Sequence, residues 1–213
     1  MTAADTLAAI AQIKVVPVGV IDDPDDAPRV AEALIEGGLG CFEVVFRTSR
    51  AAEAIGRMSR VQGILAGAGT VLTVDQVKQA VDNGASFIVS PGVDTEVLDY
   101  CAEHDICTLP GVATATEIQT CLRRNITAVK FFPSAALGGV PMINALGAPF
   151  PQVRFVPTGG VSAANLAEYL ACPKVLACGG SWLAKAELVR EKRFDEIARR
   201  AREAVVIAGA GAE

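Results

Sequence analysis

The chain has little of the chemistry from which metal centres and histidine-based active sites are built. It contains one histidine, His104, and six cysteines, no two of which are spaced Cys-x-x-Cys. These residues are too few and too scattered for a zinc site or a disulfide framework, and a lone histidine argues against a Ser-His-Asp or Cys-His mechanism. We therefore expect no metal site. The cysteines should pack as small buried hydrophobes, and the histidine should lie at the surface or at a helix end.

Basic runs, aromatic residues and long apolar stretches are also scarce. The formal net charge is −5 and aromatic residues make up 5% of the chain, so nucleic acid is not an expected partner. Apolar runs are about as long as strands and are broken by Gly or Pro, whereas a membrane helix needs roughly 20 apolar residues. The first five residues lack the basic start of a secretory signal. These absences predict a cytoplasmic protein with no membrane partner.

Short apolar runs alternate with amphipathic helical stretches along the whole chain. Gly or Pro follows successive runs at positions 69, 91, 110, 133, 159 and 179, which fits one strand and one helix per unit. Eight such units predict an α/β fold of the (β/α)₈ TIM-barrel type, with an N-terminal helix and residues 1–213 as a single domain. An open doubly wound sheet would have fewer strands and a Gly-x-Gly-x-x-Gly turn, which is absent. The expected strands are residues 15–20, 41–46, 64–68, 87–90, 106–109, 126–132, 153–157 and 175–178, and residues 207–213 are expected to fray.

Lys130 is unusual because it lies inside one of these apolar strands, which ends at Pro133. A lysine is rarely buried unless it is paired or used in chemistry. A neutral lysine amine is a nucleophile that forms a Schiff base with a carbonyl substrate. The alternative is a structural lysine whose ammonium extends past the strand end into water.

A carboxylate and a guanidinium share one face of the second strand. The two-residue period of a strand places Glu43, Val45 and Arg47 on that face, and it places Lys130 and Phe132 together on the sixth strand. If both faces point into the barrel, Glu43 lies near Lys130 and suits general acid–base catalysis. Arg47, at the strand end, can bind a carboxylate with two parallel hydrogen bonds. A structural ion pair between Glu43 and Arg47 remains the alternative.

Two glycine clusters follow the last two strands, namely Gly159-Gly160 and Gly179-Gly180, the second followed by Ser181. Barrels that bind phosphate often form the anion site from the loops after these two strands. Glycines let backbone N–H groups approach the phosphate, and a serine hydroxyl adds a hydrogen bond. Tight strand-to-helix turns, which also need glycine, are the structural alternative, but two clusters in these two places favour phosphate binding.

Six motifs in this order resemble the 2-keto-3-deoxy-6-phosphogluconate (KDPG) aldolase family over essentially the whole chain. The resemblance implies a compact barrel, usually a homotrimer, that works as a class I aldolase without a cofactor. The motifs are Gly-Ala-Gly-Thr-Val at 67–71, Ser-Pro-Gly at 90–92, Leu-Pro-Gly at 109–111, Val-Lys-Phe-Phe-Pro at 129–133, Pro-Thr-Gly-Gly at 157–160 and Gly-Gly-Ser at 179–181.

The resemblance also assigns roles to individual residues. It implies that Lys130 is the Schiff-base lysine and that Glu43 is the acid–base group. Some family members carry an arginine at the end of the first strand, where this chain has Val20, so one anion contact of those members is missing. The substrate-binding residues that it implies are Arg47 and Thr70 at the carboxylate, Pro91 and Phe132 along the pocket, Thr158 at the C4 hydroxyl, and Gly159, Gly160, Gly179, Gly180 and Ser181 in the phosphate loops.

The expected substrate is therefore a phosphorylated 2-keto acid. The expected reaction is the reversible cleavage of KDPG to pyruvate and glyceraldehyde 3-phosphate, a step of the Entner–Doudoroff pathway. An alternative or additional activity is the cleavage of unphosphorylated 4-hydroxy-2-oxoglutarate (KHG), which would use the same lysine. The same residues are also compatible with an aldolase for the phosphogalactonate epimer, with a phosphate-barrel isomerase or epimerase, and with a non-catalytic trimeric scaffold.

Overall fold

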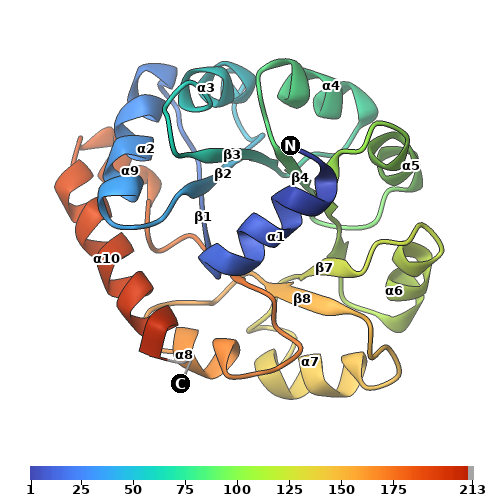
Figure 1. Cartoon of the computed structure of the whole chain (residues 1–213). Coiled ribbons are helices and arrows are strands. Elements are labelled where there is room, and N and C mark those ends of the chain that lie inside the picture. Colours follow the sequence, from blue (N-terminus) through green and yellow to red (C-terminus); the bar gives the residue numbers. More distant parts are fainter. Residues whose placement is uncertain (211–213) are drawn as a thin grey trace.

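Parallel strands form two curved sheets in the computed structural model, which describes residues 1–210. One sheet has six strands in the order β5-β4-β3-β2-β1-β9, and the other has three in the order β6-β7-β8. Together the strands curl around one axis, and Figure 1 looks along it. The strands are β1 (Val15–Gly19), β2 (Cys41–Val45), β3 (Leu65–Gly69), β4 (Phe87–Val89), β5 (Cys107–Leu109), β6 (Gly111–Val112), β7 (Ala128–Phe131), β8 (Arg154–Pro157) and β9 (Cys178–Gly180).

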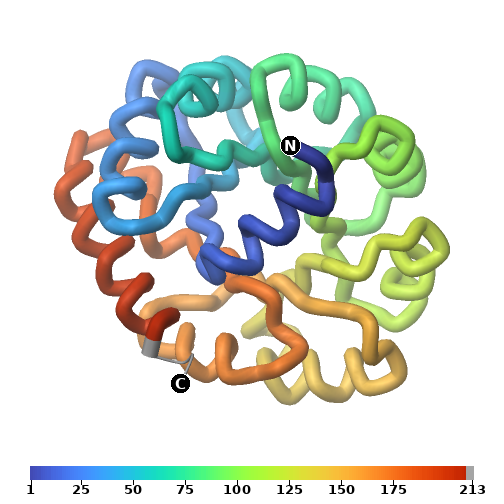
Figure 2. Tube along the Cα trace, in the orientation of Figure 1, coloured from blue at the N-terminus to red at the C-terminus, as the bar shows by residue number. Residues whose placement is uncertain are grey.

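Helices surround the strands, and the chain winds once around the axis from its N-terminus to its C-terminus (Figure 2). Thr73 caps α4 by accepting a hydrogen bond from the backbone N–H of Gln76, as expected for a threonine that precedes an amphipathic stretch. No helix within residues 1–210 is both long and apolar enough to span a membrane. The helices are α1 (Ala3–Ile13), the 3₁₀ turn η1 (Pro24–Asp26), α2 (Ala27–Glu36), α3 (Ala51–Met58), α4 (Val74–Asp82), α5 (Thr95–Glu103), α6 (Ala115–Leu122), α7 (Gly139–Gly147), α8 (Leu166–Leu170), α9 (Ala186–Arg190) and α10 (Phe194–Ala210).

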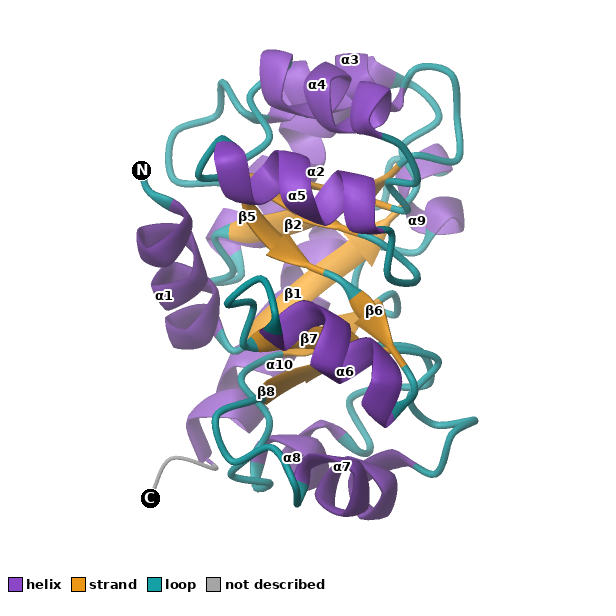
Figure 3. Ribbon diagram, turned by 90° about the vertical axis from the view of Figure 1, so that its right-hand side faces the viewer, coloured by secondary structure: helices purple, strands orange, loops and turns teal. Residues whose placement is uncertain are grey.

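Helix α1 lies across one end of the strands, as the side view in Figure 3 shows. Its Ile10 is fully buried in an apolar cluster with Val16, Cys41 and Phe87, which come from the first residues of their strands or close to them. A second and larger apolar cluster lies between the strands and the surrounding helices. Because α1 covers the amino-terminal ends, the carboxyl-terminal ends remain as the accessible face of the sheet.

Residues alternate between the two clusters along a strand, as the two-residue period requires. In β2, Cys41 belongs to the inner cluster, whereas Phe42 and Val44 belong to the outer one. Glu43 shares the inward face with Cys41. The predicted inward orientation of this face is therefore confirmed.

The sequence-based strand predictions hold, with two local differences. The fifth predicted strand, at 106–109, is present as β5, but the chain pairs again after Pro110 as β6, a short strand that the sequence does not predict. The last strand was predicted at 175–178 but spans Cys178–Gly180, where its glycines pair with Val16 and Pro17 of β1. Helix α10 continues to Ala210, so the prediction of fraying is wrong for residues 207–210, and residues 211–213 lie outside the described part.

Candidate active site

Lys130 and Glu43 form a buried ion pair between β7 and β2. Lys130 Nζ lies 3.3 Å from Glu43 Oε1, and the two residues are 6% and 3% exposed. The strands place these residues on facing inward positions, as the residue spacing predicts. A lysine whose ammonium extends into water is excluded by this burial. Burying such a pair is expensive unless function requires it, because desolvation offsets much of the attraction between the charges.

Gly69, at the end of β3, leaves the space that the Glu43 carboxylate occupies. A Cβ atom at this position would lie 2.1 Å from Glu43 Oε1 and 2.7 Å from its Cδ. Any larger residue at position 69 would therefore displace the carboxylate. The glycine in the Gly-Ala-Gly-Thr-Val motif thus has a steric cause that the sequence alone does not reveal.

The ion pair lines a cavity of about 450 Å³ that opens between the carboxyl-terminal ends of the strands. A smaller cavity of about 200 Å³ lies beside α1 and has no lysine or glutamate in its lining. The larger cavity is therefore the candidate active site. The predicted site residues that line it are Glu43, Arg47, Thr70, Pro91, Lys130, Phe132, Thr158, Gly159 and Ser181.

Arg47 and Thr70 lie on the cavity wall just beyond the ends of β2 and β3. Arg47 is exposed, and no carboxylate of residues 1–210 forms an ion pair with it. The alternative of a Glu43–Arg47 pair is thus not found, because Lys130 takes that place. Thr70 has a φ of 58°, which is strained for a β-branched residue. Such strain is found most often at functional positions. The backbone conformation is therefore evidence for a functional role of Thr70 that does not depend on the sequence motif.

The glycine loops have steric requirements of their own. Gly159 and Gly160 have φ values of 91° and 83°, which glycine adopts without strain. A Cβ at Gly179 would lie 2.2 Å from Thr158 Oγ1, and one at Gly180 would lie 1.9 Å from the Trp182 ring. Gly160, Gly179 and Gly180 themselves are not among the cavity-lining residues, in contrast to Gly159 and Ser181. Backbone conformation and close packing are therefore sufficient to explain glycine at these positions.

Two backbone N–H groups of the same loops have no acceptor within the described residues. Within residues 1–210, the N–H groups of Gly160 and Ser181 donate to no other backbone or side-chain acceptor. Free N–H groups in glycine turns are the usual way in which a loop binds an anion. The loop after β8 is also fixed in place, since Ser134 N–H donates to Thr158 O and Ala135 N–H to Gly159 O.

Aromatic and hydroxyl groups complete the wall around the lysine. Lys130 Nζ lies 5.3 Å from the centre of the Phe132 ring, a distance at which a cation is attracted to the ring face. Thr158 is 8% exposed, and its hydroxyl makes a 3.4 Å contact with the carbonyl of Val156. Pro91 forms part of the opposite rim. The lysine therefore lies between a carboxylate and an aromatic ring, which restricts where a carbonyl group can approach it.

Three charged residues of the site were missed by sequence reasoning, namely Lys185, Glu187 and Arg190. All three lie in or just before α9, the helix that follows the Gly-Gly-Ser cluster, and all line the cavity. The signal that could have found them is their position: they directly follow a loop that was already assigned to the site. Their side chains carry no motif, so the pattern alone did not distinguish them from a solvated helix face.

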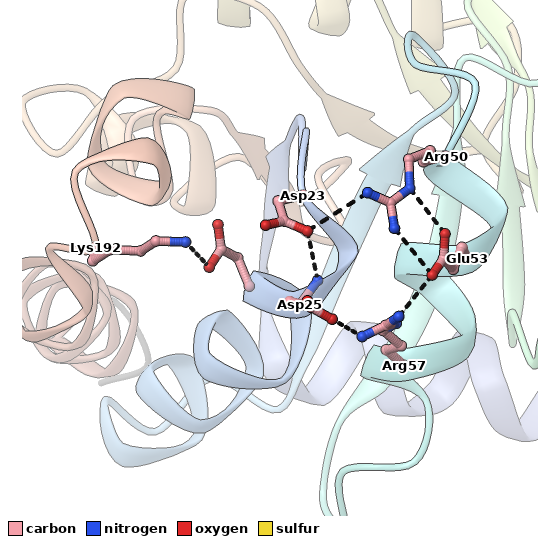
Figure 4. Close-up of polar contacts among 7 residues, drawn as sticks. Asp23, Asp25, Arg50, Glu53, Arg57 and Lys192 are labelled. Atoms are coloured by element: carbon pink, nitrogen blue, oxygen red, sulfur yellow. Dashed lines mark hydrogen bonds and ion pairs between the residues drawn. The ribbon is translucent and has the colours of Figure 1, made fainter.

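An ion-pair network fixes the acidic segment that follows β1 (Figure 4). Arg50 contacts Asp23 at 3.7 Å and forms a two-point contact with Glu53. Arg57 joins the same Glu53 to Asp25. Exposed ion pairs contribute little one by one, but a network that shares its members holds a segment more firmly.

Two further pairs connect this acidic segment to the end of the chain. Lys192 pairs with Asp26, which is 6% exposed (Figure 4). Arg190 Nε lies 2.7 Å from Asp22 Oδ2, so this cavity-lining arginine already has a carboxylate partner. The connection between β1 and α2 is thereby tied to the segment around α9, and both border the cavity.

The cysteines and the single histidine lie where the sequence predicts. All six cysteines are free and buried, and burial raises the pKa of Cys178 to about 12. His104 caps the end of α5 and is exposed, with its ring stacked on Tyr100. Among residues 1–210, no group of three His, Cys, Asp or Glu side chains is arranged to hold a metal ion.

Comparisons with known proteins agree on one family. The family model of KDPG and KHG aldolase matches residues 7–200. The 2-dehydro-3-deoxy-phosphogluconate aldolase of Treponema pallidum is 46% identical, over 94% of this chain and 96% of the relative. The KHG/KDPG aldolase of Escherichia coli K12 is 41% identical, over 90% of each chain. The KDPG aldolase of Legionella pneumophila, solved with pyruvate captured as a covalent carbinolamine intermediate, superimposes with a TM-score of 0.88 at 38% identity, covering 95% of this chain and 97% of that one.

Proposed function

This chain belongs to the KDPG and KHG aldolase family, and we propose that it cleaves KDPG reversibly to pyruvate and glyceraldehyde 3-phosphate through a Schiff base on Lys130. The observation that carries the mechanism is the buried Lys130–Glu43 pair at the wall of the 450 Å³ cavity. A buried amine beside a carboxylate, in a cavity large enough for a small sugar acid, suits carbonyl chemistry. Neither a scaffold nor a sugar-phosphate isomerase needs this lysine as a nucleophile.

The 3.3 Å contact gives a proton of Lys130 a direct acceptor in Glu43. The neutral amine adds to the C2 ketone of the substrate to give a carbinolamine. Protonated Glu43 returns its proton to the carbinolamine hydroxyl, which leaves as water and gives the protonated Schiff base. Breaking the C3–C4 bond sends its electron pair into this iminium and forms an enamine. Glu43 accepts the proton of the C4 hydroxyl, so that glyceraldehyde 3-phosphate leaves as the aldehyde. The enamine then takes up a proton at C3, and hydrolysis releases pyruvate and regenerates the amine.

The two ends of the substrate are proposed to bind on opposite walls. Arg47 and Thr70 would hold the carboxylate, since a guanidinium matches a carboxylate with two parallel hydrogen bonds. The N–H groups of Gly160 and Ser181, with the Ser181 hydroxyl, would hold the phosphate. Holding both ends places C2 beside Lys130, and such positioning lowers the barrier by removing the entropy cost of encounter.

We also propose that the barrel is closed, and we propose its oligomeric state and its location in the cell. An isolated bridge between Thr158 and Gly179 joins β8 to β9, and Pro110 is the only residue between β5 and β6. Both facts support closure of the two sheets into an eight-stranded (β/α)₈ barrel of one domain. A homotrimeric assembly and a cytoplasmic location are likewise proposed, on the strength of the family resemblance.

KHG cleavage is the second candidate function. KHG is a 2-keto acid with a C4 hydroxyl, as KDPG is. These are the groups on which Lys130, Glu43 and Arg47 are proposed to act. The phosphate loops contribute nothing to this smaller substrate. We therefore expect KHG cleavage to be slower than KDPG cleavage and to depend equally on Lys130.

Borohydride trapping with pyruvate tests the mechanism. Intact mass and peptide mapping should find one reduced pyruvyl group per chain, on Lys130. The variant Lys130→Arg keeps the buried charge but has no nucleophilic amine, so trapping should vanish and kcat should fall on the order of 10³-fold or more. The control Lys78→Arg, on the exposed face of α4, should behave like the wild type. An adduct on other lysines, or none at all with a folded wild-type protein, would refute the assignment.

A further inference from the structure

The charge of the cavity differs in sign from that of the whole chain. Four basic and two acidic side chains line the cavity, whereas the chain has a formal net charge of −5. A surplus of positive charge in a cleft attracts anionic ligands and raises their local concentration. The positions of these basic groups therefore indicate where an anion binds.

Two of the four basic groups already have a partner. Lys130 is paired with Glu43 on the cavity wall, and Arg190 is paired with Asp22 at 2.7 Å. Arg47 and Lys185 form no ion pair with any carboxylate of residues 1–210. These two are the cations that remain available to a ligand.

Lys185 is close in the chain to the glycine loop that ends in Ser181. It follows Ser181 by four residues, and both line the cavity. The intervening Ala184 is buried, and Lys185 has an extended backbone with φ −58° and ψ 142° just before α9. Its exposed ammonium sits on a flexible stem and acts as a movable point charge.

The glycine loops alone offer only neutral donors. A phosphate monoester carries about −1.5 to −2 charges at pH 7, and hydrogen bonds from charged groups are roughly twice as strong as neutral ones. Val20, which lines the cavity at the end of β1, contributes no charge. Arg47 is assigned to the other end of the substrate, so Lys185 is the cation left for the phosphate.

We propose that Lys185 binds the phosphate of the substrate and is the residue that makes this chain prefer phosphorylated over unphosphorylated 2-keto acids. The inference rests on the proposed aldolase function and deepens it. Because the phosphate is remote from the C3–C4 bond, Lys185 binds ground state and transition state equally. Its loss should therefore raise KM and leave kcat nearly unchanged.

The test compares KDPG with 2-keto-3-deoxygluconate, which is the same sugar acid without the phosphate. Pyruvate release should show that Lys185→Gln raises KM for KDPG roughly ten- to a hundredfold, the loss expected for one hydrogen bond between charged groups. On 2-keto-3-deoxygluconate, kcat/KM should change by less than about twofold. Lys185→Arg should restore KM for KDPG. The control Lys78→Gln removes the same charge from a face that does not line the cavity and should leave both substrates unaffected.

Three outcomes would overturn the inference. An equal loss on both substrates would mean that Lys185 only supports α9. An unchanged KM for KDPG would mean that the neutral donors of the glycine loops bind the phosphate without Lys185. A folded wild-type protein that neither releases pyruvate from KDPG nor is trapped by borohydride would instead refute the proposed function itself, and this inference with it.

Discussion

Gly69 offers a direct test of whether the position of Glu43 matters for the chemistry. The substitution Gly69→Ala adds a single carbon atom, which would lie 2.1 Å from Glu43 Oε1 where ordinary contacts are 3.4–4 Å. Gly69 does not have a positive φ, so alanine introduces no backbone strain. The carboxylate must therefore move by more than about 1 Å, since the β3 backbone is held on both sides by β2 and β4.

The size of the effect follows from that displacement. A misplacement of about 1 Å in a catalytic group costs on the order of 10²-fold in rate, so kcat for KDPG cleavage should fall by about this factor. Crowding in a packed interior costs about 1–3 kcal/mol of unfolding free energy. Without the clash, alanine would instead stabilise the strand by about 0.5–1 kcal/mol, because glycine has more backbone freedom to lose on folding.

The assay is steady-state pyruvate release, together with urea unfolding of the same samples. Lys130 is intact in Gly69→Ala, so borohydride trapping with pyruvate should persist while cleavage slows. Gly92→Ala is the matched control, since a Cβ there has no heavy atom within 4 Å. In a Glu43→Ala background the clash partner is gone, so the cost of Gly69→Ala in unfolding free energy should disappear. A wild-type kcat in Gly69→Ala would refute the reasoning that Glu43 must occupy its present position.

Two further predictions concern titration away from the cavity. Burial raises the pKa of Cys107 and Cys178 to about 12. Since only the thiolate reacts, mass spectrometry should find these two cysteines unmodified by iodoacetamide at pH 8 in the native protein and alkylated in urea. In α10, hydrogen bonds from Arg199 and Arg200 lower the pKa of Glu196 from 4.5 to about 2. A depressed carboxyl pKa gives stability that is present above pH 4.5 and is lost as the pH falls toward 2. The difference in urea midpoint between the wild type and Glu196→Gln should therefore shrink between pH 5 and pH 2, and a constant difference would contradict this account.

The two-residue period of the strands is the sequence feature that predicted most of the site. Lys130 and Glu43 face each other because their strands curl around one axis, and a parallel strand buried on both sides repeats its inward face every second residue. The same count placed Arg47 on the inward face. It could not show that the Arg47 side chain is exposed, because the period does not say how far the surrounding loops cover a residue at a strand end.

Glycine was the residue that sequence reasoning interpreted least well. Gly179 and Gly180 were taken as the turn after the last strand, yet they lie in β9 and pair with β1. Their lack of a side chain is required by close neighbours, namely Thr158 and the Trp182 ring. Close approach between distant segments is a tertiary property, so a single sequence cannot separate it from a turn or from a phosphate contact.

The arrangement of charge explains how an acidic chain can bind a substrate with an anion at each end. Two carboxylates at or beside the cavity are paired within the protein, Asp22 with Arg190 and Glu43 with Lys130, which cancels their field over a few ångströms. Among the lining residues that form no ion pair within residues 1–210, the cations Arg47 and Lys185 outnumber the single carboxylate, Glu187. Solvent and salt screen the remaining surface carboxylates over about 8 Å at physiological ionic strength. A ligand in the cavity therefore meets a local surplus of positive charge, which suits the proposed binding of a substrate with two anionic ends.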